Sequence, residues 1–129
     1  MTKLNLEQTI LSNLISNPDY TRKVIPYIKE EYFQDSTEKV VFKTIALYVD
    51  RYKSPPEQGV VKLDLQKVTL NEEQYKVAQE YVDNLDYDIS DEQFEWLVNE
   101  TEKWCKDKAI YNAILDGIHI IDGKSKDQT

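Results

Sequence analysis

The chain alternates between segments whose apolar residues recur every three or four positions and short polar segments rich in Asn, Ser, Asp and Pro. Apolar residues at that spacing lie on one face of an α-helix, which buries them against a core. An Asn, Ser or Asp just before such a segment caps the first turn, and a Glu or Gln three residues later completes a capping pair. The pattern therefore predicts helices joined by short loops.

Two helices are predicted at the start of the chain. Residues 6–16 form the first, behind the capping pair Asn5 and Gln8. The second runs from about Pro18 to Tyr27, with Pro26 distorting or ending it, because proline removes a backbone donor. The residues expected to face the core are Leu6, Ile10, Leu11, Leu14 and Ile15 in the first helix and Tyr20, Val24 and Ile28 at the second.

A third helix is predicted behind Asp35, which is paired with Glu38. It stops near Lys53, because Ser54-Pro55-Pro56 forces extended backbone. Its broad apolar stripe consists of Val40, Val41, Phe42, Ile45, Tyr48, Val49 and Tyr52.

Residues 60–68 fit two kinds of element. A short helix would turn Val61, Leu65 and Val68 inward, whereas the alternation of Val61, Leu63 and Leu65 also fits a strand. The pattern favours the helix and leaves the strand open.

Two further helices are predicted in the second half. Asn71 with Gln74 caps a helix that extends to about residue 85, and Ser90 with Gln93 caps the last and longest one. The inward positions are Tyr75, Val77, Ala78, Tyr81, Val82 and Leu85 in the former and Phe94, Leu97, Val98, Thr101 and Cys105 in the latter.

Beyond Lys108 the apolar residues surround the last helix on nearly all sides. A helix that is apolar all round must be covered all round, and in so small a domain we expect the cover to come from another chain. The candidate subunit interface consists of Ile110, Tyr111, Ile114, Leu115, Ile118 and Ile121. We place one domain over residues 1–121 and the start of a polar linker over 122–129.

Composition and charge limit the class of protein and the kind of partner that the chain can bind. A chain of 129 residues with 40% apolar residues and few Gly or Pro is one compact domain. Its formal charge is −8, and eleven acids against one base lie between Glu72 and Glu102, so this half should repel nucleic acid. The acids form either a solvated face or a docking surface for a basic protein. The candidate docking residues are Glu92, Glu95, Trp96 and Glu100, because Trp96 lies off the inward stripe.

The sequence offers no catalytic, cofactor or metal site. Cys105 and His119 are fourteen residues apart, too far for one helical face, and Cys105 is interpreted as a packed thiol. Gly123-Lys124-Ser125 lacks the upstream glycine of a phosphate-binding loop, and pairs such as Asp86 with Asp88 arise by chance in an acidic chain. With one cysteine, no leader and no run long enough to span a membrane, we expect a cytoplasmic protein.

Five stretches carry a resemblance through their order and spacing. They are LEQTILSNLI (6–15), Tyr32-Phe33 ahead of VFKTI (41–45), Tyr52 with Pro55-Pro56, FEWLVNETE (94–102) and KAIYNAIL (108–115). Together they resemble the N-terminal domain of DnaB-like hexameric replicative helicases, and those of T-even-type phages in particular. The likeness covers residues 4–121, and it departs from the bacterial members at Lys39-Val40, where those carry basic or His residues.

The resemblance implies an all-α fold: a compact bundle of about six helices that ends in a long helix beginning a protruding helical hairpin. It also implies a collar in the primosome, where such domains dimerise through their hairpins into a trimer of dimers and where primase, or a helicase loader, docks. ATP, Mg²⁺ and DNA unwinding would belong to a C-terminal motor domain, whose Walker motif and arginine finger are absent here. Little direct binding of nucleic acid is expected.

Three hypotheses follow. The leading one is a non-enzymatic module for subunit pairing and partner docking in DNA replication. The alternative is a free-standing acidic phage protein that inhibits a host DNA-binding enzyme by mimicking the charge of DNA, which would need acids spaced regularly along one surface. The third, a small hydrolase that uses paired carboxylates, would need a pocket with convergent acids.

Overall fold

The computed structural model describes residues 5–68, 71–85 and 93–127, with side chains as far as Ile118. This part of the chain contains six α-helices and no strand, so the predicted all-α class is confirmed. The helices are α1 (Leu6–Ser16), α2 (Pro18–Val24), α3 (Ser36–Tyr52), α4 (Gln58–Asp64), α5 (Glu72–Asp83) and α6 (Phe94–Asp127). Short 3-10 turns cover Ile25–Tyr27, Glu30–Tyr32 and Leu65–Lys67.

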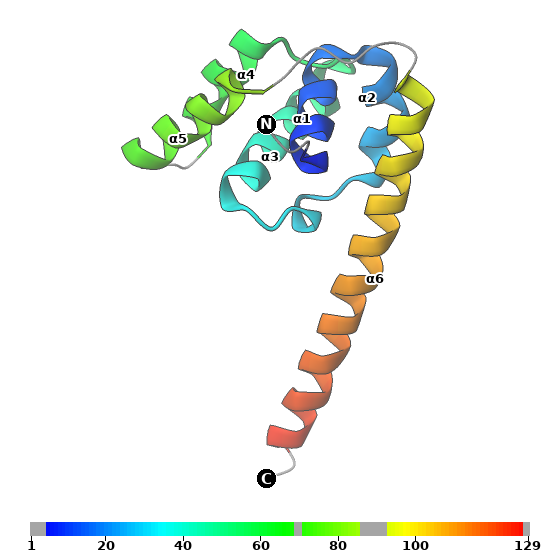
Figure 1. Ribbon diagram of the computed structural model, residues 1–129. Helices are drawn as coiled ribbons and strands as arrows, with labels where there is room; N and C mark the ends of the chain where they lie inside the picture. Colours follow the sequence, from blue (N-terminus) through cyan, green and yellow to red (C-terminus); the bar gives the residue numbers. More distant parts are fainter. Residues whose placement is uncertain (1–4, 69–70, 86–92, 128–129) are drawn as a thin grey trace.

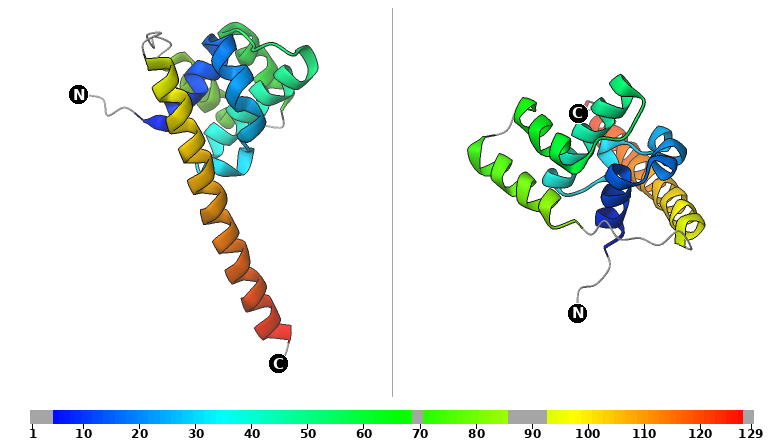
Figure 2. Two further views of the ribbon diagram at one scale, coloured as in Figure 1. Left: turned by 90° about the vertical axis from the view of Figure 1, so that its right-hand side faces the viewer. Right: turned by 90° about the horizontal axis from the view of Figure 1, so that it is seen from above.

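The helices form a globular body from which one helix projects. Within the body, α1 packs against α2 and α3, the first half of α6 packs against α2, and α4 and α5 pack against α3 (Figure 1). The second half of α6 extends well beyond the body, as Figure 1 and the left-hand view of Figure 2 show. A helix of 34 residues is roughly 50 Å long, so α6 contributes to the core at one end and reaches far from it at the other.

Asparagine caps begin several helices where the sequence predicts them. The Asn5 side chain accepts hydrogen bonds from first-turn amides of α1 at 2.9 and 3.4 Å, and the Asn17 side chain accepts from the Tyr20 amide at 3.2 Å. At α5 both bonds of the predicted pair form: the Gln74 amide donates to Asn71 at 2.8 Å, and the Asn71 amide donates to Gln74 at 3.2 Å. Local spacing is enough to predict such bonds.

The predicted pairing of Asp35 with Glu38 is wrong. Asp35 does cap α3, accepting from the Thr37 amide at 2.9 Å. Glu38 instead is buried and accepts a hydrogen bond from the Tyr81 hydroxyl on α5 at 2.7 Å. The partner comes from 43 residues away, so spacing along α3 could not show it.

Backbone constraints set the ends of α2 and α3. Helix α2 ends at Val24, ahead of the predicted Tyr27, and the chain continues as the 3-10 turn that contains Pro26. Helix α3 ends where Lys53 adopts a left-handed conformation with φ 57°. Both helices therefore stop within a few residues of the predicted positions.

The ambiguous segment is helical. Helix α4 and the following 3-10 turn cover Gln58 to Lys67, and the strand alternative was wrong. Val61 and Leu65 are buried completely, as the helical spacing requires, whereas Leu63 is exposed. The position of Leu63 explains the misleading alternation, because an apolar residue on the solvent face completed the strand pattern.

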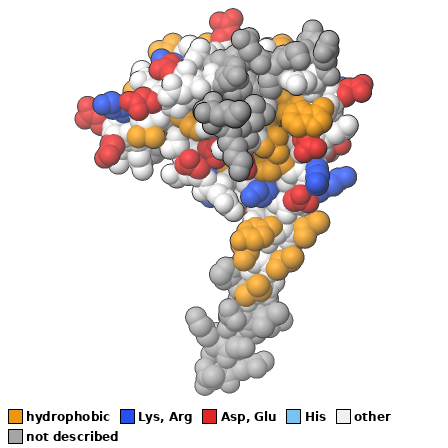
Figure 3. Space-filling model, viewed as in Figure 1, with side chains coloured by type: hydrophobic (Ala, Val, Ile, Leu, Met, Phe, Trp, Pro, Cys, Tyr) orange, Lys and Arg blue, Asp and Glu red, His pale blue; other side chains and the backbone are white. Residues whose placement is uncertain are grey.

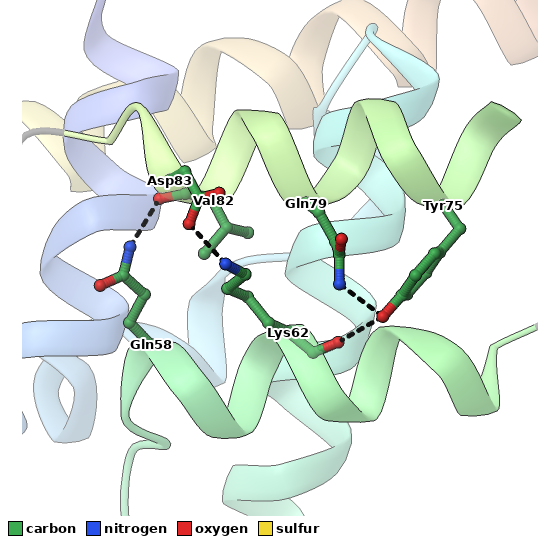
Figure 4. A network of polar contacts seen from close by, with 6 residues as sticks. All are labelled: Gln58, Lys62, Tyr75, Gln79, Val82 and Asp83. Carbon is green, nitrogen blue, oxygen red and sulfur yellow. Dashed lines mark hydrogen bonds and ion pairs between the residues drawn. The ribbon is translucent and has the colours of Figure 1, made fainter. Parts of the chain in front are cut away.

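Helices α4 and α5 are held together by polar contacts between side chains and backbone (Figure 4). The Gln58 side chain donates to the carbonyl oxygen of Val82 at 3.2 Å, and the Lys62 ammonium lies 2.7 Å from a carboxylate oxygen of Asp83. The Tyr75 hydroxyl donates to the Lys62 carbonyl oxygen at 3.5 Å. These contacts hold α4 and α5 beside each other, and both helices also pack against α3.

Buried contacts anchor the first half of α6 to the body. The Tyr20 hydroxyl lies 2.7 Å from the Thr101 hydroxyl, and both residues are buried. The Trp104 ring packs 5.0 Å from the Phe33 ring, and the Trp104 indole N–H donates to a Glu7 carboxylate oxygen at 3.2 Å. Trp104 was absent from the predicted inward stripe, although it carries much of this contact.

Two residues predicted to face inward are exposed. Tyr52 lies in the last turn of α3, beside a hollow in the surface, and Val77 lies on the outer side of α5. On α5 the inward positions are taken by Ala78 and Val82, which are buried. Apolar stripes drawn from spacing were therefore wider than the faces that the fold covers.

The backbone of α6 remains helical through Asp127. The sequence places the start of a polar linker at residue 122, within this helix. The boundary between the domain and a linker stays a prediction.

Candidate subunit interface on the α6 stalk

The stalk, defined here as residues 109–127 of α6, leaves the body after a strongly anchored first half. Leu97, Thr101 and Cys105 are spaced four residues apart and buried, so this face of α6 is turned to the body. The last polar contact described between α6 and the body is at Asn112, whose side-chain amide donates to the Glu31 carbonyl oxygen at 3.4 Å. Beyond it the helix runs clear of the body (Figure 1).

The structure leaves the predicted interface residues uncovered by their own chain. The exposed fractions of the side chains range from 36% to 59% for Ile110, Tyr111, Ile114, Leu115 and Ile118. The side chain of the sixth predicted residue, Ile121, lies outside the described residues. Figure 3 shows hydrophobic side chains gathered on the described part of the stalk, below a group of charged side chains where the helix leaves the body.

The exposed apolar side chains share one side of the helix. Ile110, Ile114 and Ile118 are spaced four residues apart, and Tyr111 and Leu115 flank them, so the five span an arc of about 140° at 3.6 residues per turn. The polar residues Asn112 and Asp116 lie outside this arc. Among the side chains described, the large apolar ones lie on one side of the helix, whereas the exposed Ala109 and Ala113 lie outside the arc. The side chains of Ile120 and Ile121 lie outside the described residues, so the expectation of a helix that is apolar all round stays a prediction.

The predicted docking residues lie at the other end of α6. Trp96 is 50% exposed, Glu95 is exposed and Glu100 is half-buried. Trp96 and Glu100 are one turn apart and therefore lie on the same side of the helix. The fourth predicted residue, Glu92, lies outside the described residues.

Cys105 has the surroundings of a structural thiol. It is buried, and burial, together with the nearby charge of Glu102, raises the pKa of the thiol to about 11. A thiol with such a pKa is almost fully protonated at neutral pH, whereas nucleophilic cysteines require a lowered pKa. The side chain of His119 lies outside the described residues.

The described residues show no arrangement typical of a metal or acid–base centre. No three His, Cys, Asp or Glu side chains among them converge so that they could hold a metal ion. Burial raises the pKa of the Glu38 carboxyl, but the bound partner of this carboxyl is the Tyr81 hydroxyl rather than a second acid. Also within this part of the chain, no helix is both long and apolar enough to cross a membrane.

Comparison with known proteins adds an independent observation. No protein-family model matches the chain. The chain is 35% identical over 113 residues to the "DnaB-like replicative helicase" of Enterobacteria phage T4. The matched part is 88% of this chain but 23% of the helicase, so the chain spans less than a quarter of the length of this relative. The resemblance seen in the sequence is thus confirmed: the chain is similar to a phage DnaB-like replicative helicase, over a length consistent with an N-terminal domain.

Proposed function

We propose that this chain is the N-terminal collar module of a phage replicative helicase and that its stalk pairs with the stalk of a second copy. The observation that carries the proposal is the exposed apolar arc from Ile110 to Ile118 on a helix that projects from the body. A surface that is complementary to itself forms a two-fold interface, in which both copies contribute the same residues. Pairing of two stalks would bury the exposed apolar arc of each copy against that of the other.

The energy available from this arc is moderate. Since about half of each side chain is already covered, burying the five residues contributes roughly 4 to 8 kcal/mol per copy, or roughly 8 to 15 kcal/mol for two. The association of two proteins costs about 4 to 15 kcal/mol. Pairing through the described residues alone is therefore expected to be weak to moderate. The assembly of such dimers into a larger oligomer would need further contacts.

The exposed Trp96, with Glu95 and Glu100 beside it, supports a second role as the docking surface for a primase or a helicase loader. An exposed tryptophan provides a large apolar anchor, and adjacent acids favour a basic partner. ATP, Mg²⁺ and DNA unwinding would belong to the motor part of such a helicase, since neither the sequence nor the described side chains offer a site for them here.

The alternative of a DNA mimic has less support. Such a protein needs acids at regular intervals along one surface. On α5 the exposed Glu72, Glu73, Glu80 and Asp83 are interrupted by Lys76 and by the apolar Val77. The acidic face of α5 is therefore better explained as a solvated surface.

The test replaces Ile114 and Ile118 with Asp and measures self-association by sedimentation equilibrium. We expect the parent chain to dimerise at high micromolar concentration, and the double variant to remain monomeric with an unchanged helical circular-dichroism signal. The matched control is Leu63→Asp with Val77→Asp, which places the same charges on exposed apolar sites of the body and should leave dimerisation unchanged. A parent chain that stays monomeric at high concentration would contradict the proposal.

A further inference from the structure

Helices α4 and α5, with the 3-10 turn that follows α4, form a unit at one side of the body. We call residues 58–67 and 72–83 the α4–α5 unit. The side chains of Gln58, Lys62 and Tyr75 each bond to the facing helix of the unit (Figure 4). The Gln66 side-chain amide also donates to the Tyr75 hydroxyl at 2.9 Å. These bonds do not involve α3, so they can persist when the unit moves relative to α3.

The α4–α5 unit and α6 pack against different parts of the body. Within the described part of the chain, the unit packs mainly against α3, whereas α6 packs mainly against α2 and the turn Glu30–Tyr32. Figure 1 shows the unit at one side of the body and α6 at the other. The unit contributes aliphatic side chains to the core, among them Val61, Leu65 and Val82, all buried completely. The contact of α6 contains the larger ring of Trp104, which packs against Phe33.

A buried carboxyl lies at the contact between the unit and α3. Glu38 on α3 accepts a hydrogen bond from the Tyr81 hydroxyl of α5 at 2.7 Å. The charged groups that act on Glu38 are Glu7 of α1 and Asp35 at the start of α3, and both are acids. Among the described residues, no Lys or Arg nitrogen lies within 4.0 Å of these three carboxylates. A buried charge without a cation costs free energy, so the ionised carboxyl weakens this contact.

The connection from α3 to the unit allows a change of direction. Helix α3 ends at Lys53, which has φ 57°, and Ser54-Pro55-Pro56 follows outside any helix. The two prolines have no amide hydrogen to donate. Movement at this connection therefore breaks few backbone hydrogen bonds.

We propose that the α4–α5 unit opens from α3 as one body while α1, α2, α3 and α6 remain packed, and that the ionised carboxyl of Glu38 favours this opening. The frequency of a local opening depends on the contacts that it breaks. Here these are aliphatic contacts and the bond between Tyr81 and Glu38, whereas the polar bonds within the unit are kept. Opening would expose the apolar residues of the unit and leave the anchor of α6 intact. This motion goes beyond the proposed pairing and docking roles, because neither the stalk nor Trp96 takes part.

Native-state hydrogen exchange of the full chain, followed for each amide by NMR at neutral pH, tests the proposal. We expect the helical amides of α4 and α5 to share one opening equilibrium constant. This constant should be at least about tenfold larger than that of the amides in α1, α2 and the first half of α6.

A matched pair of variants locates the contacts that each opening breaks. Val82→Ala on α5 should raise the opening constant of the unit about tenfold, because the deleted methyl groups pack only in the closed form. Val24→Ala on α2 removes an equally buried side chain. It should raise the exchange of α1, α2 and α6 and leave the opening constant of the unit unchanged, because α2 stays packed when the unit opens.

Glu38→Gln tests the role of the carboxyl and keeps an acceptor for Tyr81. Burial raises the pKa of Glu38 in the closed form, so the open form loses its proton first as the pH rises from about 4. After correction for the intrinsic exchange rate, the unit of the parent should open more often at neutral pH than at about pH 4, and Glu38→Gln should remove most of this difference. Glu80→Gln, at an exposed site of α5, is the control and should keep the difference.

Three results decide against the proposal. It is overturned if the amides of the unit share one opening constant with those of α1, α2 and α6, or if Val24→Ala opens the unit as much as Val82→Ala does. The role of the carboxyl is contradicted if Glu38→Gln and Glu80→Gln behave alike. If Val82→Ala does not fold, the parent and Val24→Ala decide by themselves whether the unit opens independently.

Discussion

At the scale of single residues, Glu38 shows how burial changes an ionisable group. Burial raises the pKa of its carboxyl above the ordinary value of 4.5, and the charges of Asp35 and Glu7 act in the same direction. The hydrogen bond from Tyr81 opposes this shift but does not cancel it. The charged form of Glu38 is thus less stable in the folded protein than in the unfolded chain.

We predict that Glu38→Gln stabilises the protein more at about pH 7 than at about pH 4. Well below pH 4.5 the Glu38 carboxyl is protonated in both the folded and the unfolded protein. As the pH rises, the unfolded chain loses this proton first. The free energy of unfolding of the parent therefore falls until the pH exceeds the raised pKa of Glu38 in the folded protein. Gln keeps an acceptor for Tyr81 and carries no charge. Urea unfolding at the two pH values tests this, with the exposed Glu30→Gln as the control. Equal effects of Glu38→Gln at both pH values would contradict it.

Residue-level features could be predicted where the partner is close in sequence. Asn71 and Gln74 form their reciprocal bonds as predicted, because both partners belong to one helical turn. The partners of Glu38 and Trp104 are 43 and 97 residues away, and no periodicity along a single helix contains that information. Candidate docking residues cannot be identified from the sequence for a related reason, because the exposure of a side chain does not show which partner binds it.

At the scale of elements, the end of α3 is held by a residue in an unusual conformation. Lys53 has φ 57°, in the left-handed region that glycine adopts without strain. The Lys53 amide still donates to the Val49 carbonyl oxygen at 2.7 Å and so terminates the helix. The nearby Asp50 lies 3.9 Å from the Lys53 ammonium, but both side chains are largely exposed and this pair contributes little.

We predict that Lys53→Gly raises the free energy of unfolding by about 1 kcal/mol, because glycine removes the steric cost of the left-handed conformation. The measurement is the urea midpoint, with an unchanged slope of the transition. Lys53→Ala is the matched control, since it removes the same charge and keeps the Cβ atom. A gain of the same size in both variants would assign the effect to charge and not to backbone conformation.

The positions of the helices could largely be predicted from the sequence, whereas the width of the buried face of each helix could not. Asn and Asp caps and prolines marked the beginnings and ends of α1, α2 and α3, because these residues act on the adjacent backbone. The stripe of α3 was extended to Tyr52, which the fold leaves exposed. How far a stripe is covered depends on where α4 and α5 pack, and this is decided by the tertiary structure.

At the scale of the whole molecule, the exposed stalk is the feature that the sequence indicated best. The apolar residues beyond Lys108 were too many for a small domain to bury, and Ile110, Ile114 and Ile118 are indeed exposed. The hollow between the C-terminal half of α3 and the segment from α4 to Val68 could not be predicted, because its lining residues belong to separate elements whose relative placement the sequence does not give. That a second copy covers the stalk remains a prediction of the proposed function.

We predict that the purified chain neither hydrolyses ATP nor binds a single-stranded oligonucleotide tightly at physiological salt. No hydrolysis is expected because the sequence contains no complete phosphate-binding loop, and weak oligonucleotide binding is expected because the formal charge is −8 and clustered bases are scarce. Phosphate release and filter binding measure the two activities. A titration at low salt is the control, since binding seen only there is non-specific. Turnover that persists above a buffer blank after repeated purification would contradict the assignment as a non-enzymatic module.

Helix α6 is one unbroken element from the buried Leu97 to beyond Ile118. An α-helix resists bending over such a length, so a displacement of its far end must turn the body through the Trp104 contacts with Phe33 and Glu7. A force on the stalk would therefore reach the body through the buried contacts of α6, which include those of Thr101 and Trp104. Gly117 has open space where a Cβ atom would stand, so no neighbour among the described residues requires a glycine there, and glycine lowers helix stability by about 1 kcal/mol relative to alanine.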